Sequence, residues 1–234
     1  MSIIVLLAAL LPVGILIFYI NYKDRLSPEP GRELVRAFLT GMLSVPLSFC
    51  VSVPFELLGF YSQEPTGILG SVALSFFGAA IPEELAKLFI LWLVLRNNRC
   101  FDEKMDGIVY AVCVSLGFAA VENVMYLFSS YDNFVSVGIG RALFAVPGHF
   151  CFGVIMGYYY SLARFYPDGP KKNKSLVLIA PVLVHGIYDS ILFVSNVTPA
   201  LSGILTIVFL YFCHKMWKYG SKSINEHLQR DLCK

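Results

Sequence analysis

Two adjacent carboxylates and an amine stand in "IPEELAKLFILWLV", residues 81–94, a segment that is otherwise apolar. Glu83 and Lys87 are four residues apart, so on a helix they share a face and can form an ion pair. Glu84 points about 100° away from Glu83 and can serve a different partner. A charge at the centre of a membrane helix costs about 2.5 to 3.5 kcal/mol on insertion scales, so such residues are functional candidates by default.

Three further apolar segments carry polar residues of the same kind. They are Glu122, Asn123 and Tyr126 in "GFAAVENVMY", His149 in "RALFAVPGHF", and His185 and Asp189 in "HGIYDS". Glu122 shares a helix face with Tyr126, and His185 shares one with Asp189, which can orient the imidazole. Ionisable residues in four separate segments exceed what hydrogen bonding between helices requires, which favours a function.

Other polar and small residues in these segments have simpler interpretations. Glu56 and Arg141 lie nearer the outer ends of their segments, and we interpret both as side chains that reach the membrane surface. The GxxxG pattern Gly153–Gly157 predicts a close approach of a neighbouring helix just after His149.

The elements that must position these residues are membrane helices. Of 234 residues, 57% are hydrophobic and 15% are charged, which excludes a soluble domain of this size. Apolar runs near the length needed to cross a bilayer occur at about 2–20, 34–60, 67–95, 107–128, 138–163, 175–195 and 200–217. The first run lacks a basic leader and a small-residue cleavage site, so we expect it to be retained. The predicted fold is an all-α polytopic bundle of about seven spans.

The charges of the connections predict its orientation. Lys and Arg gather in 21–33, 96–106, 164–174 and the tail after 217, whereas 61–66, 129–137 and 196–199 contain none. By the positive-inside rule the N-terminus is outside and the C-terminus inside. The alternation also requires 67–95 to cross once, despite Pro82. His149 and His185 then fall near the midplane, and four helices direct polar groups toward one layer.

The remaining features of the sequence concern its domains, its cysteines, its net charge and its location. We expect one domain over 1–234, with a motif-bearing core at about 75–195 and a cytoplasmic tail at about 218–234. The six cysteines show no CxxC spacing, so neither a disulfide framework nor a zinc knuckle is predicted. The net charge of +2 gives no reason to expect a nucleic acid, and topology explains the basic connections. The expected location is the cell membrane, with the lipid bilayer as surroundings.

Glutamate and histidine inside a bilayer are compatible with hydrolysis, with proton-coupled transport and with a metal enzyme. The sequence contains no HExxH, no GxGD and no GxSG. The usual signatures of zinc, aspartyl and serine intramembrane proteases are therefore missing, and the double glutamate remains.

Taken in order, "PEELAK", "GFAAVENVMY", "RALFAVPGHF" and "HGIYDS" resemble the motifs of the PrsW family of membrane proteases. That family is related to the CAAX prenyl endopeptidases and the bacteriocin-processing proteins. The resemblance spans about 75–195, and it departs at Val121, where an aromatic residue is expected before Glu-Asn. It implies a protease that cuts a membrane-anchored substrate of the anti-sigma factor type. An outward-side first cut would then lead to sigma-factor release under envelope or antimicrobial-peptide stress.

On that basis the expected catalytic residues are Glu83, Glu84, His149 and His185, supported by Lys87, Glu122, Asn123, Tyr126 and Asp189. One glutamate of the pair would activate water as a general base, and His149 would share the water or protonate the leaving amine. His185 and Asn123 would stabilise the oxyanion. Glu122 would either join the site or brace Lys87. No metal or other cofactor is expected.

Two alternatives use the same residues. In the first, Glu83 or Glu84 together with Glu122, His149 and His185 forms the metal site of a metal-dependent hydrolase. In the second, the histidines and glutamates form the proton relay of a transporter. The transporter is the weaker alternative because the sequence shows no inverted repeat.

Overall fold

The computed structural model of the chain describes residues 2–166 and 172–232. The basic connection 164–174 is therefore seen only at its two ends, and Lys171 and Lys234 lie outside the described residues. Within the described residues all regular structure is helical. The predicted all-α bundle is confirmed.

The predicted spans correspond to seven helical rods. They are α1 (Ser2–Lys23), α2 (Gly31–Met42) with α3 (Ser44–Leu57), α4 (Gly67–Ala73) with a π-helical segment (Leu74–Ala80) and α5 (Ile81–Leu95), α6 (Lys104–Ser129), a 3₁₀ turn (Tyr131–Asn133) with α7 (Phe134–Gly140), a second π-helical segment (Arg141–Ala145) and α8 (Val146–Phe165), α9 (Lys172–Val197), and a 3₁₀ turn (Pro199–Leu201) with α10 (Ser202–Leu232).

Six of these rods are long and apolar enough to cross a membrane. The rod over 67–95 is not among the six, and it is the one that carries Glu83, Glu84 and Lys87. It is nevertheless helical from end to end, so the expected continuity across Pro82 is confirmed, while its single crossing of the membrane stays a prediction. Its α5 part contacts α3, α6 and α9.

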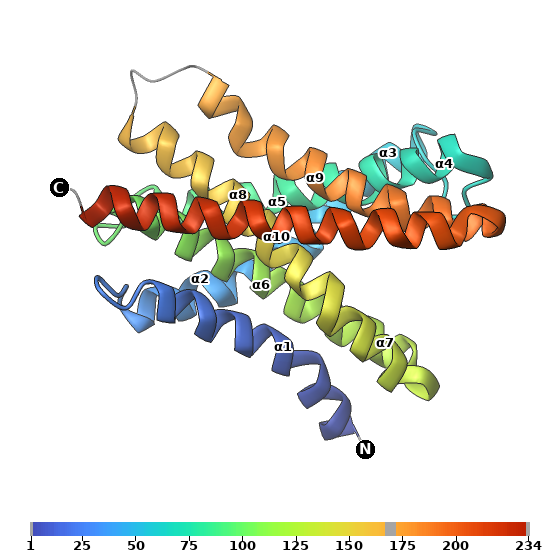
Figure 1. The fold of residues 1–234 in the computed structure, drawn as a ribbon, viewed down its shortest axis with the longest axis horizontal. Helices are drawn as coiled ribbons and strands as arrows, with labels where there is room; N and C mark the ends of the chain where they lie inside the picture. Colours follow the sequence, from blue (N-terminus) through green and yellow to red (C-terminus); the bar gives the residue numbers. More distant parts are fainter. Residues whose placement is uncertain (1, 167–171, 233–234) are drawn as a thin grey trace.

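The connections divide between the two ends of the bundle (Figure 1). The α1–α2 connection and the end of α10 lie on the left, and the α3–α4 connection, α7 and the α9–α10 connection lie on the right. The start of α1 packs beside α7. Basic and neutral connections thus lie at opposite ends, as the alternation predicts; which end faces the cytoplasm remains a prediction from the positive-inside rule.

Helix α6 is the centre of the bundle. It is almost entirely buried from Lys104 to Ala120 and packs against α1, α2, α5, α8 and α10. Its closest partner is α8, where a Cβ placed on Gly157 would collide with the carbonyl oxygen of Gly107. The GxxxG prediction is therefore confirmed, because only glycine lets the two backbones approach so closely.

The predicted tail does not leave the bundle. Helix α10 runs without interruption to Leu232 and buries Ile224 and His227. The ring of His227 stacks on Tyr158 of α8 at 4.5 Å. The described part of the tail is thus a packed end of the last helix.

Candidate active site

A proline precedes each histidine or glutamate that the sequence analysis placed at the centre of the site. Pro82 lies directly before Glu83, Pro147 two residues before His149, and Pro181 four residues before His185. Proline has no N–H to donate and its ring disturbs the preceding turn, so a helix distorts there. The two π-helical segments end directly before the turns that contain Pro82 and Pro147. Such π segments are frequent at functional sites, since they turn the residues that follow.

Lys87 holds the two adjacent carboxylates together. Its Nζ lies 3.2 Å from Glu83 Oε2 and 2.8 Å from Glu84 Oε1, and it also stands 4.1 Å above the ring of Phe118. The predicted Glu83–Lys87 ion pair is confirmed. The expectation that Glu84 would serve a different partner is only half right, because Glu84 shares the lysine and adds a second partner on α9.

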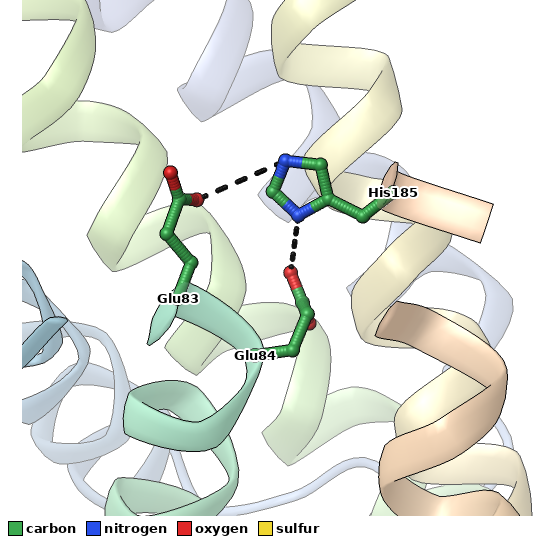
Figure 2. A group of neighbouring side chains, drawn as sticks. All are labelled: Glu83, Glu84 and His185. Atoms are coloured by element: carbon green, nitrogen blue, oxygen red, sulfur yellow. Dashed lines mark hydrogen bonds and ion pairs between the residues drawn. The ribbon is translucent and has the colours of Figure 1, made fainter. Parts of the chain in front are cut away.

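That second partner is His185 (Figure 2). Its Nδ1 lies 3.0 Å from Glu84 Oε1, and its Nε2 lies 3.2 Å from Asp189 Oδ2 and 4.0 Å from Glu83 Oε2. The predicted His185–Asp189 pair is confirmed. Because both ring nitrogens face carboxylates, the doubly protonated imidazolium matches these surroundings best.

His149 has different surroundings. Its Nε2 lies 2.8 Å from Glu122 Oε2, and its Nδ1 lies 3.2 Å from Lys87 Nζ. The ammonium of Lys87 can only donate hydrogen bonds, so His149 Nδ1 accepts from it and His149 Nε2–H donates to Glu122. The His149 ring is therefore neutral. Glu122 therefore braces His149, and it reaches Lys87 only through that ring.

Arg141 belongs to the same cluster, and its interpretation as a side chain that reaches the membrane surface was wrong. Its guanidinium bonds Glu122 Oε2 at 2.6 Å and Asn123 Oδ1 at 2.5 Å, and it lies 4.1 Å from the centre of the Tyr126 ring. Arg141 begins the motif "RALFAVPGHF", but its place near the outer end of its segment favoured a surface position over a role in the cluster. Arg141 is the first residue of the second π-helical segment, and it lines the same cavity as His149.

Asn123 is not placed to stabilise an oxyanion. Its Oδ1 accepts from Arg141 and its Nδ2 donates to the Ala9 carbonyl at 3.0 Å. The side chain is buried between α1 and α6 and is absent from the lining of the cavity that the neighbouring groups surround. It holds Arg141 in place.

These groups surround one cavity of about 310 Å³, which we call the inner cavity. Its polar lining consists of Glu83, Glu122, Arg141, His149, His185 and Asp189, together with Tyr126 and Tyr188. Glu84 and Lys87 are not part of the lining and are almost completely buried behind it. Glu83 is therefore the member of the glutamate pair that a molecule in the inner cavity can touch.

A metal ion could be held by a subset of these residues. Ligand atoms of Glu83, Glu84 and His185 all lie within 4.8 Å of one another. Glu84 Oε2 is buried and has no hydrogen-bond partner among the described residues. Two carboxylates and an imidazole are a chemically suitable donor set for a catalytic metal. Lys87 stands between this trio and His149, so the predicted four-residue metal set divides into two groups.

Comparisons with known proteins agree with one another. Residues 29–214 match the model of a family described as "PrsW family intramembrane metalloprotease". A "Protease PrsW" of Clostridioides difficile is 34% identical over 95% of this chain and 90% of its own. A "Protease PrsW" of Oceanobacillus iheyensis is 36% identical over 94% of this chain and 98% of its own length. One of Bacillus subtilis is 37% identical over 79% of this chain and 81% of its own length. No solved structure matches.

The match covers the four segments that carry the cavity residues, and these relatives are similar to the chain over most of their length. The helices long and apolar enough to cross a bilayer make it a multi-pass membrane protein. The chain therefore belongs to the PrsW family of intramembrane proteases.

Proposed function

We propose that this protein hydrolyses a peptide bond of a membrane-anchored substrate of the anti-sigma factor type, and so starts the release of a sigma factor under envelope or antimicrobial-peptide stress. One observation carries the hydrolytic part: ionisable residues from four separate rods line a single cavity inside the bundle. The substrate type and the stress role rest on the resemblance of the sequence to the family.

In this proposal Glu83 is the general base. It lines the inner cavity, whereas Glu84 does not, so Glu83 takes a proton from water and passes it to the leaving amine. Glu84 is a positioning residue, since it bonds Lys87 and His185 behind the cavity wall. Lys87 and His185 pair with both carboxylates and so offset their negative charge.

The other cavity residues bind and orient the reacting groups. His185, bonded to carboxylates through both nitrogens, and Arg141 present positive charge where the carbonyl oxygen becomes an oxyanion. His149 keeps a neutral ring between Glu122 and Lys87 and thereby holds these two charged groups in place beside the inner cavity. Asp189 holds the His185 ring against rotation.

The family's description as metalloproteases raises the question of a metal, and the residues present fit one. Glu83, Glu84 and His185 would hold it. A divalent ion bound there would polarise the attacking water and the scissile carbonyl. Glu122, Arg141 and His149 would keep the roles given above.

Cleavage of tagged single-pass anti-sigma factors, co-expressed with the protease at equal membrane levels, tests the proposal. Glu83→Gln should lower the rate at least about 100-fold, the usual contribution of a general base. Glu84→Gln and His149→Ala should each lower it strongly. Wild-type rates from Glu83→Gln would refute the role of Glu83. Glu64→Gln is the control, because Glu64 is an exposed residue outside both the cavity and the rods.

Metal binding by the protein is tested in a separate experiment. Purified wild type, Glu84→Gln and His185→Ala are analysed for bound metal and assayed before and after strong chelation. Stoichiometric metal that both substitutions remove supports the Glu83–Glu84–His185 site. Full activity after complete chelation would exclude a metal-dependent reaction while leaving the role of Glu83 intact.

A further inference from the structure

A second cavity meets the inner cavity at the candidate base. It has a volume of about 470 Å³ and lies on the α3 side of Glu83, and we call it the outer groove. Glu83, Glu122 and Tyr126 line both spaces. At its other end the lining reaches Glu56 and Gln63, and Gln63 is exposed in the α3–α4 connection. The outer groove therefore leads from one surface of the bundle to the candidate base.

A ladder of polar residues on α3 lines this groove. Ser48, Ser52 and Glu56 follow one another at four-residue intervals, so they lie on one helix face. The Ser48 hydroxyl donates to the Val45 carbonyl at 2.7 Å and the Ser52 hydroxyl to that of Phe49 at 3.5 Å. Each hydroxyl donates its hydrogen bond to a carbonyl of its own helix, and its oxygen keeps lone pairs that can accept hydrogen bonds.

Ordinary helix packing does not account for the ladder. Within the described residues neither serine hydroxyl bonds another helix, although polar residues in membrane helices commonly do so. From Ser48 to Glu56 the ladder rises about 12 Å, the length of about four extended residues. A row of acceptors of this length suits the N–H groups of an extended peptide.

The charge of Glu56, at the surface end of the outer groove, indicates which charge a bound peptide carries. Glu56 Oε2 accepts from Tyr61 Oη at 3.3 Å and from Gln63 Nε2 at 3.1 Å, and both donors are neutral. Within residues 2–166 and 172–232 no Lys or Arg forms an ion pair with Glu56. The adjacent connection 61–66 contains no basic residue that could do so. A half-buried carboxylate of this kind attracts a cation.

We propose that the outer groove binds an extended segment of the substrate on one side of the scissile bond, with a substrate Lys or Arg paired to Glu56. In this proposal Glu56, which lies near the outer end of its rod, also has a role in specificity. The inference rests on the proposed proteolytic function, and it names the part of the substrate that this surface selects.

A charge-reversal experiment tests the pairing. In a substrate that wild type cleaves, Lys and then Glu are placed in turn at each of the six positions on either side of the cut. Cleavage is measured with wild type, Glu56→Gln, Glu56→Lys and the control Glu64→Gln. At one position wild type should prefer Lys, Glu56→Gln should lose about 5- to 20-fold in kcat/KM, mainly through KM, and Glu56→Lys should prefer Glu.

Two results would overturn the pairing. One is an unchanged substrate ranking with Glu56→Lys. The other is an equal loss on every substrate, which would assign the groove to the passage of water. Wild-type rates and rankings are expected from Glu64→Gln, since that residue is absent from the groove lining.

A cross-linking measurement separates this inference from hydrolysis itself. In a Glu83→Gln background without other cysteines, Ser52→Cys should form disulfides with cysteines placed one at a time along the membrane-proximal segment of the substrate. Native Cys50, restored alone, should not, because it is exposed on another face of α3. Cross-links at position 52 without any cleavage by wild type would support the groove and refute the protease. Cross-links at position 50 alone would refute the groove.

Discussion

At the scale of single residues, the site is a network in which each cation serves two or three acceptors. Lys87 bonds Glu83, Glu84 and His149, and Arg141 bonds Glu122 and Asn123. The positions of the residues that line the inner cavity therefore depend partly on residues buried behind the lining. Removing one partner of such a buried pair costs about 3 to 5 kcal/mol, because the other charge is left without compensation.

Arg141 gives the sharpest test of this network. Arg141→Lys keeps the charge but cannot reach Glu122 and Asn123 together, because an ammonium lacks the planar fork of a guanidinium. We expect cleavage to fall about tenfold or more with little change in membrane level, and Arg141→Ala to be destabilised as well. Cleavage rates and thermal unfolding in detergent measure the two effects. Full activity of Arg141→Lys would show that the fork is not needed.

At the scale of elements, proline and glycine decide where the site residues point. The π-helical segments before Pro82 and Pro147 turn Glu83 and His149 toward the same space. The glycines of α8 let α6 come close, and this approach carries the Ser115 hydroxyl to the His149 carbonyl at 2.7 Å. Local helix distortion and close packing thus act together on the same histidine.

Pro82→Ala restores an N–H and allows the rod over 67–95 to become a regular α-helix. Loss of the extra π-helical residue would turn Glu83 by about 100° relative to the preceding rod. We expect at least a tenfold loss of cleavage without a fall in unfolding temperature. The control is Pro12→Ala, inside α1 and remote from the inner cavity. A fully active Pro82→Ala would separate the π segment from the position of Glu83.

Gly157→Ala tests the α6–α8 contact. The added methyl group meets the Gly107 carbonyl and the Ile108 Cα, both of them backbone atoms of α6. Overpacking of this kind costs about 1 to 3 kcal/mol, which lowers the midpoint of thermal unfolding in detergent. Gly203→Ala in α10 has open space around it and should leave the midpoint unchanged. Equal midpoints for the two variants would contradict the tight contact.

At the scale of the whole molecule, the helices leave an acidic junction at the end of the bundle opposite α7. Asp24 and Glu29 lie in the connection between α1 and α2, and Glu29 accepts a hydrogen bond from Tyr110. Burial, reinforced by the charge of Glu29, raises the pKa of Asp24 from 3.8 to about 7. Burial also raises the pKa of Glu29.

The raised pKa of Asp24 makes stability depend on pH. The folded protein binds this proton more tightly than the unfolded chain, so the stabilisation is fully present below about pH 4 and is lost as pH rises through about 7. Asp24→Asn does not titrate at this position. Its unfolding temperature should exceed that of wild type at pH 8, and the difference should shrink at pH 5. A difference that is constant between pH 5 and pH 8 would contradict the shift.

The sequence by itself determined the helical class, the number of rods, their alternation and the identity of nearly all ionisable residues around the inner cavity. These follow from hydropathy, charge and four-residue spacing, which act along the chain. The tertiary structure decided which glutamate faces the cavity and what Arg141 and Asn123 bind, because those choices depend on how α5, α6 and α8 are rotated against one another. It also revealed the outer groove, because the polar ladder on α3 and Glu83, nearly thirty residues further along the chain, line one space only in the folded bundle.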